Sequence, residues 1–303
     1  MKALVIGYGS IGQRHVRILR EMGIDVSIVS RRAKQDLDFY QRIECAFKTN
    51  HFEYIVIANE TVAHLKTLRE IIDNQFKGKI LIEKPLFAKM EPVYFDNSNT
   101  FVAYNLRFHP LIQRLKELLK DEEVVSVNTY AGQYLPSWRP NEDYTKGYSA
   151  SSEQGGGVLR DLSHELDYLM ELFGEWHLLI AKTNKISKLN IQSEDYVHIS
   201  YKTNQQVHIA LELNYLDRIT QRFVIVQTNE KTIKIDFIEN TINCNGEIQR
   251  LTKIDRDYTY IKQHEAILNN SEGCCTFSEG LNVVKMIEAV EKSSLLKEWV
   301  YND

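Results

Sequence analysis

The sequence predicts an α/β protein with two domains: a parallel-sheet domain at residues 1–120, and an α/β domain with a mostly antiparallel sheet at residues 121–303. Up to about residue 120, short apolar runs alternate with helical patterns, which is typical of a parallel sheet with crossover helices. Later runs alternate with a period of two residues and are joined by short turns, which indicates hairpins. A glycine-rich turn directly after the first apolar run completes the pattern expected of the first domain.

The elements of the first domain follow in order along the chain. Apolar runs predict strands at residues 3–6, 25–30, 53–59, 79–83 and 100–104. Amphipathic spacing predicts helices at residues 13–22, 62–74 and 111–119. Strand and helix therefore alternate through this part of the chain.

The second domain has a different pattern. A strand is predicted at residues 124–133, and hairpins are predicted at 194–215, 222–237 and 240–251, the first of them turning at Thr203-Asn204-Gln205. Helices are predicted at 158–173, which ends at Gly174, and at 258–268 and 277–300. We expect an antiparallel sheet with helices on one face.

The bulk composition is that of a globular protein. Of 303 residues, 43% are hydrophobic and 26% are charged, which is ample material for a core. A net charge of −4 without a basic block argues against nucleic acid or an anionic membrane as the main partner. The first apolar run is too short for a signal peptide, no stretch is long enough to span a bilayer, and the four cysteines lack metal-ligand spacing. We expect a cytoplasmic protein without a metal site.

The glycine-rich turn contains Gly7, Gly9 and Gly12 in a G-x-G-x-x-G spacing between the first strand and the first helix. In a dinucleotide site, the first glycine makes the turn, the second lets the backbone approach the pyrophosphate, and the third lets the helix pack closely. The N–H groups at the helix start then face the phosphates. Tyr8, Ser10 and Ile11 belong to the same predicted cofactor site. The alternative is a tight turn without a ligand.

The end of the second strand normally selects between the two nicotinamide cofactors. A carboxylate about 20 residues past the glycines would bind the ribose 2′-hydroxyl of NAD, but this chain has Ser30-Arg31-Arg32 there. A hydroxyl and two guanidinium groups suit a 2′-phosphate. NADP(H) is therefore favoured over NAD(H), unless Arg31 and Arg32 are only solvated surface charges.

Two further segments carry residues suited to catalysis. Glu83-Lys84-Pro85 follows a predicted strand, so Lys84 lies at a carboxyl end, where open α/β sheets bind ligands; Pro85 restrains its backbone and admits a cis bond. Gly155-Gly156-Gly157 leads into the predicted helix at 158–173, on which Asp161 and His164 share a face. A carboxylate beside a histidine suits a general acid/base. The alternatives are a surface lysine and an aspartate that stabilises the helix start.

These motifs occur together in an order that resembles the Gfo/Idh/MocA oxidoreductase family. Additional matches are Ala58-Asn59-Glu60-Thr61 with His64, and Tyr104-Asn105-Leu106-Arg107-Phe108-His109-Pro110. The resemblance covers nearly the whole chain. It implies a Rossmann domain followed by an α/β domain built on a large, mostly antiparallel sheet.

The resemblance also implies roles for individual residues. Lys84, Asp161 and His164 would line the reactive centre. The cofactor site would include the glycine motif together with Asn59, Thr61, His64, Glu83 and Lys84. Many members space the Asp and His four residues apart, whereas this chain spaces them three apart, so Asp167 is an alternative partner for His164.

The loop before the three glycines resembles a branch often associated with surface-sugar and amino-sugar pathways. It mixes aromatic, cationic and acidic side chains, which suits the C–H faces and hydroxyls of a sugar. The candidate substrate-binding residues are Arg107, Trp138, Arg139, Asp143, Tyr144 and Tyr148. The alternative is a loop that packs its own Trp and Tyr side chains as a lid support.

Together these observations predict an NAD(P)-dependent oxidoreductase. The expected reaction transfers hydride between nicotinamide and a secondary alcohol or ketone of a sugar, inositol or nucleotide-sugar-like substrate. Two alternatives stay open: a glycosidase that acts by transient oxidation, and a regulator that binds a dinucleotide without turnover. The resemblance further implies a homodimer or homotetramer.

Overall fold

The computed structural model describes residues 1–31 and 38–302, which divide into two compact units. The first unit comprises Met1–Phe108 and Asp255–Val284, and the second comprises His109–Ile254 and Lys285–Asp303. The predicted boundary at residue 120 is therefore displaced, and a later segment returns to the first unit. The reason is tertiary packing: helix α7 (Tyr258–Leu268), predicted in the second domain, packs against α1 (Ser10–Glu21).

The first unit contains a seven-stranded sheet in the order β15-β6-β5-β4-β1-β2-β3. Its strands are β1 (Lys2–Ile6), β2 (Asp25–Val29), β3 (Phe39–Tyr40), β4 (Tyr54–Ile57), β5 (Lys79–Ile82), β6 (Thr100–Val102) and β15 (Cys275–Thr276). All neighbours pair in parallel except β15, which runs antiparallel to β6. The order of the six parallel strands is that of a Rossmann fold.

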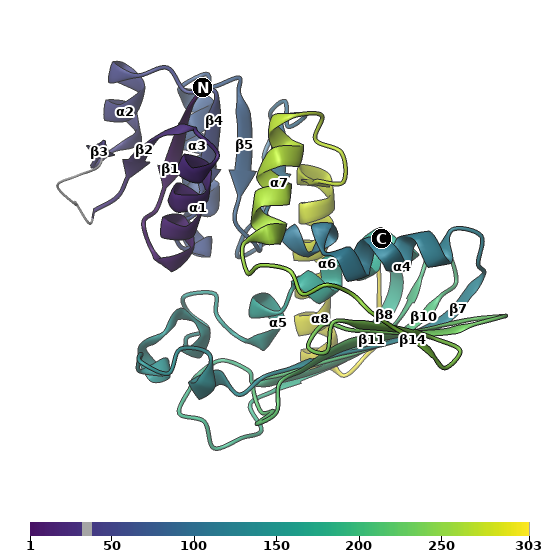
Figure 1. Ribbon diagram of the computed structural model, residues 1–303. Helices are drawn as coiled ribbons and strands as arrows, with labels where there is room; N and C mark the ends of the chain where they lie inside the picture. The colour runs from purple at the N-terminus through teal and green to yellow at the C-terminus, as the bar shows by residue number, and fades with distance from the viewer. Residues whose placement is uncertain (32–37, 303) are drawn as a thin grey trace. The chain divides into compact units, whose positions relative to one another are not determined.

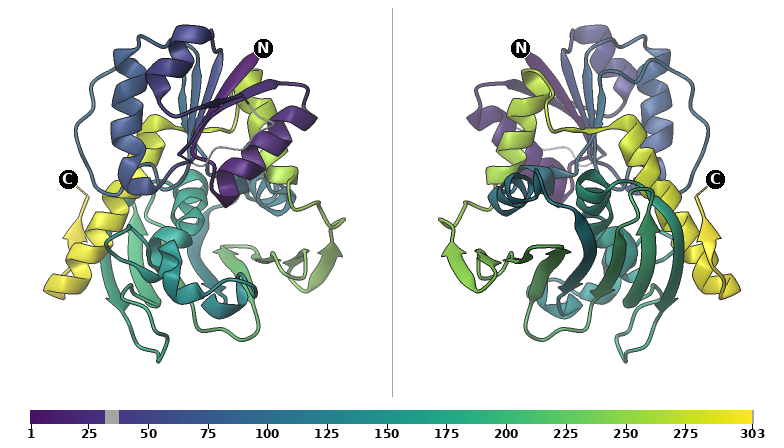
Figure 2. Two further views of the ribbon diagram at one scale, coloured as in Figure 1. Left: turned by 90° about the vertical axis from the view of Figure 1, so that its left-hand side faces the viewer. Right: turned by 90° about the vertical axis from the view of Figure 1, so that its right-hand side faces the viewer.

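Helices cover both faces of this sheet (Figure 1, Figure 2). Helix α3 (His64–Asp73) lies on one face, and α1 and α7 lie on the other; α2 (Ile43–Thr49) precedes β4. The strands are apolar on both faces because both are covered, and the core includes Leu4, Val26 and Val56. Each fully buried side chain of this size contributes about 1.5–3 kcal/mol.

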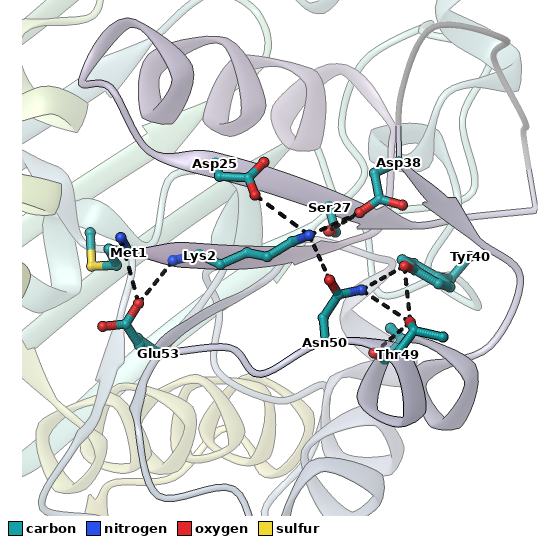
Figure 3. A network of polar contacts seen from close by, with 10 residues as sticks. Met1, Lys2, Asp25, Ser27, Asp38, Tyr40, Thr49, Asn50 and Glu53 are labelled. Atoms are coloured by element: carbon teal, nitrogen blue, oxygen red, sulfur yellow. Dashed lines mark hydrogen bonds and ion pairs between the residues drawn. The ribbon is translucent and has the colours of Figure 1, made fainter.

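The amino-terminal edge of the sheet is held by polar side chains (Figure 3). The Lys2 ammonium lies 3.1 Å from an Asp38 carboxylate oxygen and donates to the Asn50 amide oxygen at 2.7 Å. The Ser27 hydroxyl donates to the same Asp38 oxygen at 2.7 Å. The hydrogen bond from Ser27 is the main cause that lowers the pKa of Asp38, with Lys2 adding to it. The Asp38 carboxylate thus binds Ser27 and Lys2 beside the middle of β2. It does not supply a ribose-binding carboxylate at the end of β2.

The second unit contains a nine-stranded sheet in the order β14-β13-β12-β11-β7-β10-β9-β8-β16. Its strands are β7 (Val124–Gly132), β8 (Trp176–Asn184), β9 (Tyr196–Thr203), β10 (His208–Asn214), β11 (Gln221–Thr228), β12 (Thr232–Asp236), β13 (Thr241–Cys244), β14 (Glu247–Arg250) and β16 (Val300–Tyr301). The neighbours are antiparallel except β7 and β10, which are parallel. The predicted hairpins are confirmed, while β8 was not predicted.

Helices α4 (Pro110–Leu119) and α6 (His164–Phe173) lie on one side of this sheet in Figure 1. Helix α8 (Phe277–Leu296) begins in the first unit and ends in the second, where the Ser293 and Ser294 hydroxyls accept the N–H groups of Ala181 and Thr183 in β8. None of the helices in the part of the chain that the structure describes is both long and apolar enough to cross a membrane.

Candidate active site

The first half of the candidate site is the glycine turn of the first unit. Gly7 has a φ of +100°, and a Cβ there would lie 2.5 Å from the Ala58 carbonyl oxygen. A Cβ on Gly12 would lie 2.1 Å from the Gly7 carbonyl oxygen, so the start of α1 touches the turn. Gly9 differs, because a Cβ there would meet no atom within 4 Å. The middle glycine therefore leaves its backbone open at the amino end of a 12-residue helix, which is the geometry of a phosphate cradle.

The other residues of the motif support this turn. The Tyr8 ring packs edge-on against Phe39 at 5.5 Å, and Ile11 packs against the buried core. Ser10 is exposed at the first position of α1. The helix start thus presents one hydroxyl and several backbone N–H groups to solvent, as an anion site requires.

Asn59 lies directly after β4, at the carboxyl edge of the sheet beside Gly7. Its amide nitrogen donates to the Thr67 hydroxyl at 2.8 Å. Its Oδ1 is buried and has no hydrogen-bond partner among the described residues. Because a buried acceptor without a donor is costly, this atom marks a place for a ligand donor. The residues at this edge therefore fit a dinucleotide.

His64 occupies a supporting position rather than an open one. It is buried, and its ring nitrogens lie 3.1 Å from the carbonyl oxygens of Asn59 and Leu86. Burial lowers its pKa, and the hydrogen bonds to these carbonyls oppose that effect. His64 thereby joins the end of β4 to the segment after Lys84, while Thr61 is buried in the short turn that precedes α3.

Lys84 and Glu83 follow β5 at the same edge. The Lys84–Pro85 bond is cis, as the sequence admitted. Glu83 is buried, its Oε2 accepts the Lys84 backbone N–H at 3.1 Å, and its Oε1 lies 2.8 Å from His15 Nε2. Burial alone would raise the pKa of Glu83, but the hydrogen bond from His15 and the charge of Lys84 hold it below its ordinary value.

The end of β2 carries Ser30 and Arg31. The Ser30 N–H donates to the Tyr40 carbonyl at 3.0 Å, which fixes the turn after the strand, and Arg31 is exposed. Arg32, the second predicted phosphate-binding arginine, lies outside the described residues.

The second half of the candidate site lies in the second unit. The predicted helix at 158–173 is two helices, α5 (Val158–Asp161) and α6 (His164–Phe173), separated at Leu162 and Ser163. The prediction that Asp161 and His164 share one helix face is therefore wrong: Asp161 ends α5 and His164 begins α6. The apolar spacing of the two helices is continuous enough in sequence to hide the break. Asp167, the alternative partner, is buried in α6.

Asp161 is held by hydroxyl groups. Its Oδ2 accepts the Tyr215 hydroxyl at 2.6 Å and is also contacted by the Ser149 hydroxyl. Burial of Tyr215 and its contact with Asp161 raise the tyrosine pKa well above its usual range, so the tyrosine remains a donor. The Asp161 carboxylate is thus fixed in direction by neighbours that the sequence did not reveal.

The glycines before α5 make close approaches. A Cβ on Gly156 would lie 2.0 Å from the Tyr148 carbonyl oxygen, and Gly157, with a φ of +120°, would place one 2.2 Å from Glu194 Oε1. The same Glu194 oxygen accepts the Leu159 N–H at 3.1 Å. Burial raises the pKa of Glu194 to about 7. Sequence analysis missed Glu194, because an acidic residue before a strand carries no signal of its own.

The predicted substrate loop is partly joined to Asp161. The Trp138 ring packs edge-on against Tyr215 at 5.2 Å, and its buried Nε1 has no partner among the described residues. Tyr148 lies against the glycines. Arg139 is exposed and forms an ion pair with Glu142 at 3.2 Å.

The remaining loop residues make local contacts. Asp143 accepts the Thr145 N–H at 3.1 Å, and the Tyr144 hydroxyl accepts the Asn190 N–H at 3.3 Å. The loop therefore folds on itself and also presents exposed polar groups, and substrate binding by these residues stays a prediction.

Arg107 belongs to the first unit. It is buried there, and its guanidinium lies 3.0 Å from the Glu279 carboxylate. A buried arginine with this ion pair stabilises the packing of the unit. That Arg107 binds substrate stays a prediction.

The comparison with known families decides the identity of the second unit. Residues 112–232 match the family described as the GFO/IDH/MocA C-terminal domain. Residues 112–232 thus form a Gfo/Idh/MocA C-terminal domain. The resemblance drawn from the motifs is thereby confirmed, and the two-domain α/β fold is confirmed with it. No curated protein sequence matches the chain.

Solved structures share the fold over the whole length. The WlbA dehydrogenase from Bordetella pertussis, in complex with NADH and UDP-GlcNAcA, has 15% identity and a TM-score of 0.80, with 100% of this chain and 98% of that chain covered. The UDP-N-acetylglucosamine 3-dehydrogenase GnnA from Acidithiobacillus ferrooxidans has 16% identity and a TM-score of 0.78, covering 98% and 99%. The myo-inositol 2-dehydrogenase from Lactobacillus plantarum has 16% identity and a TM-score of 0.78, covering 100% and 99%.

Proposed function

We propose that this protein is an NAD(P)-dependent oxidoreductase acting on a secondary alcohol or ketone of a sugar, inositol or nucleotide sugar. The observation that carries this proposal is the open backbone at Gly9 with the unpartnered Asn59 Oδ1 at the same sheet edge. Similarity to NADH-bound and sugar-acting structures supports the cofactor and substrate classes.

The dinucleotide would be held by the first unit. The N–H groups at the start of α1 would bind its pyrophosphate over Gly9, and Asn59 Oδ1 would accept a donor from it. Ser30 and Arg31 at the end of β2 favour the 2′-phosphate of NADP(H), because no carboxylate among the described residues occupies that end. When bound, the cofactor supplies or accepts the hydride.

The proton would be handled by residues of this chain. In oxidation, the His164 imidazole takes the proton of the substrate hydroxyl, and in reduction it returns that proton. The Lys84 ammonium would donate to a substrate oxygen and stabilise the charge that develops on it. Asp161, fixed by Tyr215, orients the reacting hydroxyl group or the histidine.

The substrate would be recognised by the loop of the second unit. Trp138, Tyr144 and Tyr148 would offer ring faces, while Arg139 and Asp143 offer exposed charged groups. This mixture suits a hydroxylated substrate that carries an anionic group. A homodimer or homotetramer is part of the same proposal, and light scattering of the purified protein measures it.

Two measurements test the proposal. Titration with NADPH and NADH, followed by nucleotide fluorescence, should show binding of both and at least equal affinity for NADPH. A screen of sugars, inositols and nucleotide sugars should then show nicotinamide reduction, and Lys84→Ala and His164→Ala should each lower kcat by roughly 10²-fold. The exposed variant His208→Ala serves as the control. Binding without any turnover on this panel would instead support a regulator, and sugar release without a net absorbance change would support a glycosidase.

A further inference from the structure

Four buried polar side chains form a continuous row in the first unit. The Tyr54 hydroxyl lies 2.9 Å from His264 Nδ1, and His264 Nε2 lies 2.9 Å from His15 Nδ1. His15 Nε2 then lies 2.8 Å from the Oε1 atom of Glu83. The row joins strand β4, helix α7, helix α1 and the end of β5, which are far apart in the sequence.

The direction of these hydrogen bonds follows from the partners that each group has. The Tyr54 hydroxyl contacts only His264 among the described side chains, so its proton points to His264 Nδ1. A neutral His264 then donates from Nε2 to His15 Nδ1, and a neutral His15 donates from Nε2 to Glu83. Every donor therefore points toward one carboxylate. This arrangement satisfies all four groups without placing a second charge in the interior.

We propose that this row holds Glu83 as an anion in a fixed position beside Lys84, which makes His15 a positioning residue for the lysine. Glu83 uses its second oxygen to accept the backbone N–H of Lys84, so the row also fixes the lysine's backbone. Attraction between the carboxylate and the ammonium stabilises the charged forms of both groups. This inference rests on the proposed catalytic role of Lys84.

The surroundings of His264 favour its neutral form. Burial, with a smaller contribution from His15, lowers the pKa of His264 well below its usual range. Burial likewise raises the pKa of Tyr54 well above its usual range, with Cys274 adding to the effect. Tyr260, whose ring lies 5.8 Å from His15, also faces the row.

Two cations are among the charged groups here, and one of them, Arg14, forms an ion pair with Asp257 at 3.4 Å. The Arg14 guanidinium lies 4.9 Å from the centre of the Tyr260 ring, and Lys84 lies on the far side of Glu83. Both cations favour an ionised carboxylate over a charged histidine.

The first experiment needs no substrate. In protein labelled with ¹⁵N at the histidine rings, nuclear magnetic resonance distinguishes a protonated Nε2 from a protonated Nδ1. We expect that His15 and His264 are both neutral at pH 7, each with its proton on Nε2. Spectra of the His15→Gln and His264→Gln variants assign the signals to the two residues. A doubly protonated His15, or an Nδ1 proton on His264, would overturn the proposed direction whether or not the protein is an oxidoreductase.

The second experiment measures the effect on Lys84. His15→Leu removes both contacts of the imidazole, whereas His15→Gln keeps one donor and one acceptor in an amide. We expect His15→Leu to lower kcat about tenfold with less than a twofold change in KM, and His15→Gln to recover most of that loss. Glu83→Gln should move the basic limb of the kcat–pH profile down by about one pH unit, because Lys84 loses its counter-charge.

Controls separate this from a general loss of structure. The exposed variant His51→Gln should leave the profile unchanged, and thermal unfolding shows which variants are folded. If folded His15→Leu and His15→Gln lose equal activity at every pH, the row is structural only and the inference fails. If wild-type protein turns over no sugar, the proposed function fails, and the labelled histidines still decide the row.

Discussion

The two units build their parts of the candidate site from different materials. In the first unit, the site consists of backbone: an open glycine, the start of a helix, and carbonyls held by a buried histidine. In the second unit, it consists of ionisable side chains: Asp161 under two hydroxyls, and Glu194 against a glycine. A site made of backbone is disturbed when a substitution adds a side chain to a glycine. A site made of ionisable side chains is disturbed when a charged group is removed or when the pH changes its protonation.

The largest loss of stability is expected when the ion pair between Glu165 in α6 and Arg222 in β11 is broken. Glu165 is fully buried, and its two oxygens accept from Arg222 Nε at 2.6 Å and Nη2 at 3.0 Å. Arg222→Ala leaves the carboxylate buried without its partner, so the free energy of unfolding should fall by about 3–5 kcal/mol. Urea unfolding of the whole protein measures this.

Two controls sharpen the result. Arg114→Ala removes an exposed pair with Glu117 and should change the free energy of unfolding by at most about 0.5 kcal/mol. The double variant Arg222→Met/Glu165→Leu should recover most of the loss, since no charge then remains buried. An Arg222→Ala variant as stable as Arg114→Ala would show that the loss of a buried charge partner does not disturb the second unit.

The same difference explains what the sequence could predict. The glycine turn depends on contacts between residues close together in the chain, such as Gly7 with Gly12, so its spacing reveals it. The contacts of Asp161 with Tyr215 and of Gly157 with Glu194 join distant segments, and no local pattern reports them. For the same reason the break between α5 and α6, the strand β8 and the return of α7 to the first unit were missed.

A smaller effect is expected from the pH response of Glu194. Its pKa in the folded protein is raised by burial from 4.5 to about 7, so the folded state favours the protonated form. The stability it contributes is present below pH 4.5 and is lost as the pH rises through 7. Glu194→Gln keeps an acceptor for the Leu159 N–H and cannot ionise. At pH 8 it should therefore be more stable than wild type by up to about 2–3 kcal/mol.

Unfolding free energies at pH 4.5 and pH 8, for wild type and variant, measure this. The wild-type protein should lose more stability between the two values than Glu194→Gln does. Glu230→Gln, which changes an exposed carboxylate, should follow wild type. Equal losses in wild type and Glu194→Gln would show that Glu194 is ionised normally, and that the second unit has no pH-sensitive carboxylate at the start of α5.

The smallest effect on stability is expected in the backbone half of the site, where two glycines separate folding from binding. Gly9 has an extended backbone that alanine adopts, and its added Cβ meets no atom, so Gly9→Ala should change the free energy of unfolding by less than about 1 kcal/mol. The added methyl group would occupy the space proposed for the pyrophosphate, so affinity for NADPH and NADH should fall at least about tenfold, or about 1.4 kcal/mol.

Gly12→Ala is the matched contrast, because its Cβ would lie 2.1 Å from the Gly7 carbonyl oxygen. It should weaken binding and also lower the free energy of unfolding by about 1–3 kcal/mol. Fluorescence titration and urea unfolding of both variants give the four values. If Gly9→Ala binds both nucleotides as wild type does, no phosphate lies over Gly9, and the open backbone there has another use.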